Sequence, residues 1–163
     1  MEPIKRLYLD TNMFILLGEG HGDARRSHLI DIVSAAPARD SAFLCTSEFT
    51  LAELLVVPFR QKNHQLIELY KGWVHPGSPW LEAAPVERDL LIHAALFRDQ
   101  YPGVKMPDAI HLTTALFLTA DKGIPRTSRI TMPGPKGFSR TSEDLAAIEP
   151  TVENLKSISA QLQ

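Results

Sequence analysis

The sequence predicts an α/β fold, a three-layer α/β/α sandwich in which helices cover both faces of a central parallel sheet. Two short apolar runs, 6–10 (RLYLD) and 41–47 (SAFLCTS), read as strands, and each passes directly into a helix-like pattern. Several later segments repeat apolar residues at helical spacing. Buried strands that alternate with amphipathic helices are typical of a parallel sheet enclosed on both sides.

Length and composition favour one globular domain. The chain has 163 residues, of which 44% are hydrophobic, so it can bury one core but is short for two ordinary domains. No apolar run is long enough to span a membrane, and the N-terminus lacks a signal-peptide pattern. The lone Cys45 forms no internal disulfide, so we expect a cytoplasmic protein without a membrane partner. A net charge of −2 neither requires nor excludes a nucleic-acid partner.

The helices follow in order from their apolar stripes. One begins at Thr11 or Asn12, and others are expected within 23–36, 61–74 and 85–101. A further helix is expected from a Ser47 cap to the residue before Pro58. Proline and glycine break the pattern across 123–150, which we expect to be a long surface excursion, and 151–163 closes the single domain as a helix.

Asp10 stands where the first strand ends and a helix begins. Ligands of open α/β sheets bind beyond the carboxyl ends of the strands, so this position suits a binding residue. Asp is also a favoured helix N-cap, and that role alone would explain it. The sequence leaves both interpretations open.

Glu53 interrupts an otherwise apolar helix. It lies on a stripe with Phe49, Val56 and Val57 that we expect to be buried. A buried carboxylate is costly unless it is paired or binds a metal. The alternatives are a metal and an arginine or lysine from another element.

Two further acids lie downstream. Asp108 is in the first turn of a helix that Pro107 introduces, where an acid also complements the helix dipole. Asp121 follows a strand-like run, 116–120, and is also an ordinary turn residue in the sequence ADKG.

Acids at strand ends and helix starts can converge at one edge of a parallel sheet. Hard divalent cations such as Mg²⁺ or Mn²⁺ prefer oxygen ligands and bind through a few carboxylates. Crowded carboxylates repel one another without a cation, so the arrangement implies a metal site. His93 and His111 lie within apolar helices and are expected to be packed residues, because hard-metal sites favour oxygen.

Four motifs, YLDTNMFI, TSEFTLAELL, PDAIHLTTAL and FLTADKGI, resemble those of PIN-domain ribonucleases in order and surroundings. The nearest likeness is to VapC-like toxins of toxin–antitoxin pairs. The resemblance implies catalytic roles for the quartet Asp10, Glu53, Asp108 and Asp121, with Asp10, Asp108 and Asp121 as metal ligands. It also implies that polar residues line the site to hold substrate, namely Thr11, Asn12 and Thr119. A protein antitoxin and a homodimer are further implications.

The sequence departs from the family pattern in two places. Asp108 and Asp121 are closer together than the family's plan requires, so either the helix is short or it continues through 116–120 and Asp121 is misassigned. The chain also runs on beyond the last motif.

That extension is basic. From 122 to 142 it has no acid and five cations, namely Lys122, Arg126, Arg129, Lys136 and Arg140. Such a segment beside an acidic site is expected to hold the phosphate backbone of RNA, and the alternative is a solvated loop. Arg60 and Lys62 are weaker candidates for the same role.

The function that these residues favour is a divalent-metal-dependent endoribonuclease. A non-catalytic PIN-like module that binds RNA or protein stays open as the alternative. A phosphatase with an aspartyl nucleophile would want a second acid two residues after Asp10, and Asn12 stands there. Neither Cys45 nor Ser47 has the setting of a covalent nucleophile.

Overall fold

The computed structural model describes residues 6–38, 43–120, 128–130, 145–147 and 150–162. At 119–120, 128–130 and 145–147 it describes the backbone alone. The strands are β1 (Arg6–Tyr8), β2 (Leu44–Ser47), β3 (Glu82–Ala84), β4 (Ser128–Ile130) and β5 (Leu145–Ala147). They form one sheet in the order β3-β2-β1-β4-β5, and every neighbouring pair is parallel.

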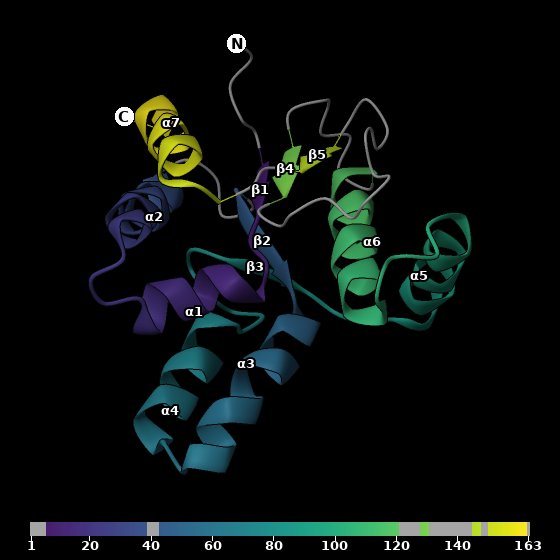
Figure 1. Ribbon diagram of the computed structural model, residues 1–163, viewed down its shortest axis with the longest axis horizontal. Helices are drawn as coiled ribbons and strands as arrows, with labels where there is room; N and C mark the ends of the chain where they lie inside the picture. Colours follow the sequence, from purple (N-terminus) through teal and green to yellow (C-terminus); the bar gives the residue numbers. More distant parts are fainter. Residues whose placement is uncertain (1–5, 39–42, 121–127, 131–144, 148–149, 163) are drawn as a thin grey trace.

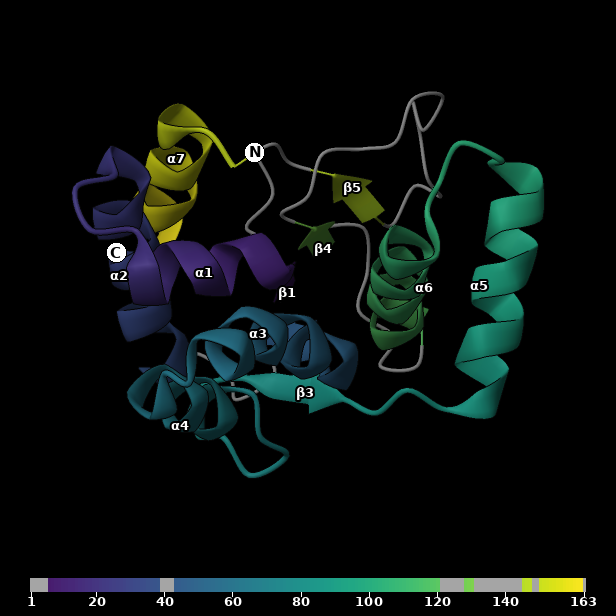
Figure 2. The ribbon, with the colours of Figure 1, turned by 60° about the horizontal axis from the view of Figure 1, so that its bottom comes forward.

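Helices cover both faces of this sheet (Figure 1). They are α1 (Thr11–Glu19), α2 (Ala24–Ala35), α3 (Glu48–Gln61), α4 (His64–Trp73), α5 (Arg88–Gln100), α6 (Met106–Ala120) and α7 (Val152–Leu162), with a 3-10 turn, η1 (Ala36–Ala38), after α2. Figure 2 shows α1, α2 and α7 grouped on one side and the α5–α6 pair on the other. The predicted three-layer α/β/α sandwich with a parallel sheet is therefore confirmed.

The side chains of β1 alternate between the two faces of the sheet, and this explains why a helical layer covers each face. Leu7 and Leu9 belong to the core cluster that α1, α2 and α7 complete. Tyr8 points the other way, and with Cys45 it packs against α5 and α6. Successive side chains of a strand face opposite sides of the sheet, so a run that is apolar throughout must be covered on both faces.

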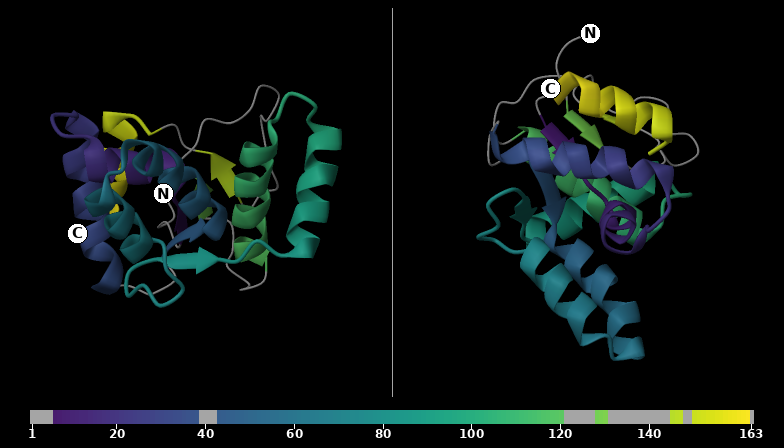
Figure 3. Two further views of the ribbon diagram at one scale, coloured as in Figure 1. Left: turned by 90° about the horizontal axis from the view of Figure 1, so that it is seen from below. Right: turned by 90° about the vertical axis from the view of Figure 1, so that its left-hand side faces the viewer.

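The helix containing Glu53 differs from its prediction in two ways. It continues through Pro58 to Gln61, and Pro58 lies on its buried face with Thr50 and Leu54. Val56 and Val57 were expected to be buried but are 44% and 49% exposed. The reason is that α3 and α4 form a hairpin that projects from the sheet, so the outer half of α3 lies beyond the sheet (Figure 3).

The segment 123–150 is not simply the surface excursion that proline and glycine predict. It contains β4 and β5, which extend the sheet beside β1. Each is three residues long, too short to be marked in the sequence: β4 (SRI) is mostly polar and β5 (LAA) is a single short apolar run. The strand-like run at 116–120 is also helical, because α6 continues to Ala120.

A buried ion pair ties the amino end of β1 to its surroundings. Arg6 is 1% exposed, pairs with Glu82 of β3 and donates from Nη1 to the Leu118 carbonyl of α6 at 2.8 Å. The carboxyl end of α6 therefore lies beside the start of β1.

Among the described helices, none is both long and apolar enough to cross a membrane.

Candidate active site

Asp10 follows β1 at the carboxyl edge of the sheet and is 5% exposed. Its Oδ1 accepts from the backbone N–H of Met13 at 3.3 Å, and its Oδ2 accepts from the Asn12 amide at 3.4 Å. The N-cap interpretation is therefore confirmed. Capping does not compete with a ligand role, because a carboxylate has about four lone-pair positions.

Glu53 is the centre of a hydrogen-bonded network at the same edge. Its Oε2 accepts from the Thr11 hydroxyl, which lies one residue after Asp10. The same oxygen lies 2.8 Å from Nε2 of His111 on α6, and Nδ1 of His111 lies 2.8 Å from the hydroxyl of Tyr8. The buried partner of Glu53 is thus a histidine rather than the arginine or lysine considered from sequence.

Asp108 reaches this edge on the same helix as His111. It lies in the first turn of α6, three residues before His111, and is partly buried. Residues three apart lie on one face of a helix, so the contact between His111 and Glu53 brings the Asp108 face toward α3. Asp10, which follows β1, and Glu53 of α3 thus form an acidic edge of the sheet, and Asp108 lies on the face of α6 that also carries His111.

Burial and charge shift the two inner carboxyls in opposite directions. Burial raises the pKa of Asp10 from 3.8 to about 6, although His111 and the Met13 N–H act in the lowering direction. Burial also raises the pKa of Glu53, but hydrogen bonds from His111 and Thr11 more than offset it, so the pKa is lowered. Glu53 is held as an anion, whereas Asp10 is an acid that a cation would help to ionise.

These donors fit a divalent cation in type. Within the described ranges, no group of three or more His, Cys, Asp or Glu side chains lies close enough together to hold a metal. Mg²⁺ is commonly bound through one or two carboxylates and keeps several waters. Asp10 and Asp108 suit that form of binding.

A cavity of about 420 Å³ opens beside Asp10. Asn12, Ile15 and Glu19 of α1 line it, with Asp23 and Arg25 on its far side. Asp23 and Arg25 form an ion pair with each other at 2.6 Å. Asn12 is exposed at this cavity, so it can contact a molecule that approaches Asp10.

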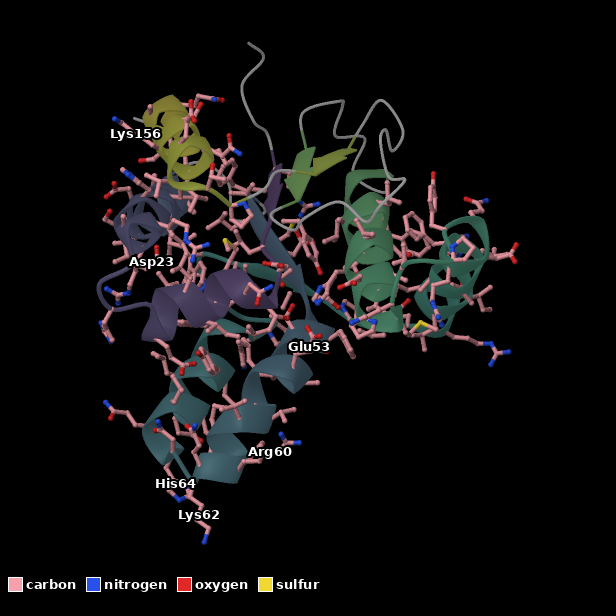
Figure 4. All side chains as sticks on the ribbon, in the orientation of Figure 1. Asp23, Glu53, Arg60, Lys62, His64 and Lys156 are labelled. Carbon is pink, nitrogen blue, oxygen red and sulfur yellow. The ribbon has the colours of Figure 1, made fainter. Side chains whose placement is uncertain are left out.

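The other predicted residues are less well placed. Thr119 lies in the last turn of α6, and Arg129 lies opposite Leu7 in β4; for both, only the backbone is described. Lys122, Arg126, Lys136 and Arg140 lie outside the described residues. Figure 4 shows Arg60 and Lys62 toward the far end of the α3–α4 hairpin, away from Glu53.

Asp121 also lies outside the described residues. The strand that was expected before it is wrong, because α6 is helical to Ala120. At 1.5 Å per residue, the end of α6 lies about 18 Å along the helix from Asp108. It lies beside Arg6, at the opposite end of β1 from Asp10. The place of Asp121 in the quartet stays a prediction.

The pKa of Asp10 predicts how stability depends on pH. In metal-free protein, the folded state keeps the Asp10 proton up to about pH 6, whereas the unfolded chain releases it near 3.8. The contribution of Asp10 to the free energy of unfolding therefore falls by roughly 2–3 kcal/mol as the pH rises from about 4 to 6. Wild type and Asp10→Asn are both treated with a chelator and unfolded in urea across this pH range. The free energy of unfolding of Asp10→Asn, relative to that of the wild type, should increase as the pH rises. A difference independent of pH would contradict the burial of an ionisable Asp10.

The chain folds as an α/β protein, and the side-chain oxygens of Asp10 and Glu53 lie beyond the carboxyl ends of its strands. A sequence model of the PIN domain family matches residues 7–129, and the chain therefore belongs to the PIN domain family. PIN domains are generally nucleases, and they generally use divalent metal ions.

A solved structure, described as a toxin–antitoxin complex from Klebsiella pneumoniae, contains a chain with a similar fold. The TM-score is 0.55 and the sequence identity is 19%, over 90% of this chain and 98% of that chain. At this identity the likeness shows the fold. The search of curated proteins finds no match.

Proposed function

We propose that this PIN-domain protein is a divalent-metal-dependent endoribonuclease that hydrolyses RNA phosphodiester bonds. The observation that carries the proposal is the pair of carboxyls at the carboxyl edge of the sheet, where Asp10 caps α1 and its neighbour Thr11 donates to Glu53. The raised pKa of Asp10, about 6, supports it, because burying such a carboxyl is unfavourable for the fold alone.

Each residue has a role that its contacts support. Asp10 and Asp108 would hold Mg²⁺ or Mn²⁺ through their oxygens, with Asp121 as the remaining candidate. When bound, such a cation lowers the pKa of a water and offsets charge on the phosphate. Glu53, kept ionised, would face the cation with one oxygen and would orient the attacking water as a hydrogen-bond acceptor. Asn12 would contact the RNA, and Thr119 stays a candidate for the same role.

We further propose that the protein is the toxin of a toxin–antitoxin pair in the cytoplasm. The solved structure of similar fold belongs to such a complex. Two contacting helices, α1 and α3, have exposed apolar side chains that would accept an amphipathic segment of an antitoxin, namely Ile15, Val56, Val57 and Phe59. The exposed residues Leu91, Ile92 and Leu96 of α5 would serve a homodimer. Cys45 is the single cysteine of the sequence and is buried, which fits a reducing compartment.

The test is cleavage of labelled RNA by protein that has been stripped of metal with a chelator. Activity should be absent until Mg²⁺ or Mn²⁺ is added, and a circular RNA should be opened, because an endonuclease needs no free end. Full cleavage in excess chelator would contradict the metal site. No cleavage at any metal concentration would favour the non-catalytic module.

The basic segment makes a separate prediction about RNA binding. Changing Arg126, Lys136 and Arg140 together to Gln should weaken RNA binding and reduce the slope of log K against log salt by about 2, because fewer counterions are released. Arg129 is left unchanged, since its backbone belongs to β4. The matched control replaces three exposed cations outside the segment, namely Lys71 of α4, Arg88 of α5 and Lys156 of α7. If the two triple variants give equal slopes of log K against log salt, the segment 122–142 is a solvated loop that does not hold RNA.

A further inference from the structure

We propose that His111 is a positioning residue that holds one oxygen of Glu53 and so leaves the other oxygen available to the metal and its water. The inference rests on the proposed function and gives a role to a residue that the sequence suggested was merely packed. His111 touches neither substrate nor metal in this account; it acts through Glu53.

The contacts of Glu53 are divided unequally between its two oxygens. Oε2 receives both protein partners, the Thr11 hydroxyl and Nε2 of His111. Oε1 accepts no hydrogen bond from any residue that the structure describes. The side chain is 29% exposed, so water reaches it. One oxygen is thus fixed by the protein, and the other has capacity for an external donor or cation.

The ring of His111 is itself fixed from behind. It is 3% exposed, and its Nδ1 lies 2.8 Å from the hydroxyl of Tyr8, which is 2% exposed. The Tyr8 hydroxyl can donate to Nδ1, whereas the Glu53 carboxylate can only accept at Nε2. Nε2 then carries the ring proton and donates to Glu53. Edge contacts with Tyr8 and Phe49 also restrict the ring, at centroid distances of 5.9 and 5.7 Å.

This arrangement has the form of a support for a metal site. Groups one step removed from a metal orient the residues that contact it, and their loss commonly costs 10- to 100-fold in metal affinity. His93 shows the contrast, because it is exposed on α5 and its Nδ1 lies 2.8 Å from the carbonyl of Asp89, within its own helix. It provides a matched control.

The experiment is titration of the full chain with Mn²⁺ by isothermal calorimetry. His111→Leu removes both ring nitrogens at similar volume and should weaken Mn²⁺ binding by about 10-fold or more. His111→Gln places an amide N–H near the position of Nε2 and should recover affinity to within about threefold of wild type, a smaller loss than that usual for removing such a group. Tyr8→Phe removes one hydroxyl and should weaken binding by an amount between these two. His93→Leu should bind Mn²⁺ like the wild type.

Wild-type affinity in His111→Leu would overturn the inference, as would equal losses in His111→Gln and His111→Leu. If His111→Leu does not fold, Tyr8→Phe decides, and unchanged Mn²⁺ affinity in that variant overturns the inference. A wild type that binds Mn²⁺ but cuts no RNA would contradict the proposed function and leave the role of His111 intact. A wild type that binds no Mn²⁺ would overturn both.

Discussion

Asp10→Asn is expected to reduce RNA cleavage to less than about one hundredth of the wild-type rate while the protein stays folded. The amide keeps the size of the side chain and still accepts the Met13 N–H, but it loses the charge that would hold a cation. The measurement is the single-turnover rate at saturating RNA and limiting metal. Asp31→Asn, at an exposed acid of α2, is the matched control and should cleave at the wild-type rate.

If Asp10→Asn cleaves RNA at the wild-type rate, the carboxylates at the carboxyl edge of the sheet do not form the catalytic site. The same assay on Asp121→Asn decides the composition of the quartet. As a predicted member of the quartet, Asp121 should be needed for cleavage, so Asp121→Asn should lose activity as Asp10→Asn does. Wild-type cleavage by Asp121→Asn would remove Asp121 from the quartet.

Glu82→Ala is expected to lower the free energy of unfolding by about 3 kcal/mol, because it leaves a buried guanidinium without its carboxylate. Arg6 is 1% exposed and pairs with Glu82, so removing the carboxylate does not let water replace it fully. The pair links β1 to β3 and, through Leu118, to α6. It therefore stabilises the strand that leads to Asp10.

The control for this variant is Glu68→Ala. Glu68 also pairs with a cation, Lys71 at 2.9 Å, but their side chains are 70% and 51% exposed. Exposed pairs contribute little, so we expect a change below about 0.5 kcal/mol. Urea unfolding of both variants gives the comparison. Similar losses for Glu82→Ala and Glu68→Ala would mean that the buried pair does not stabilise the fold.

The sequence was sufficient to place Asp10 at the end of the first strand and to indicate that Glu53 needs a partner. Asp10 closes an apolar run, and a residue at the end of a parallel strand must lie at the carboxyl edge. Glu53 was recognised because a carboxylate within an apolar helix needs a partner. Local sequence carries both of these signals.

The partner of Glu53 could not be predicted in the same way. His111 lies 58 residues further along the chain, and the contact depends on how α3 and α6 pack. A histidine in an apolar helix has the same local signature whether it packs or supports a site. Tyr8 was seen only as an apolar strand residue, although its hydroxyl approaches His111. The one signal in the sequence for this contact was that two buried elements each carry a polar group, the Tyr8 hydroxyl and the His111 ring.

Short elements and tertiary context account for the remaining differences. β4 and β5 are each three residues long, too short for a pattern to identify them, and they pair in order outward from β1. Pro58 was expected to end α3, but its ring faces the buried side and the helix continues. Arg6 was assigned to an apolar strand, and nothing near it in the sequence identified Glu82 as its partner.

The central claim is that the acidic edge binds a divalent cation, and thermal unfolding tests it most directly. Wild type and Asp10→Asn are melted side by side, after chelation, across one titration of Mn²⁺. A cation that binds the folded state alone stabilises it by mass action, by about 2.7 kcal/mol at one hundred times its Kd. The melting temperature of the wild type should therefore rise with Mn²⁺ while that of Asp10→Asn stays nearly constant. An unchanged wild-type melting temperature, or the same rise in both proteins, would contradict the claim.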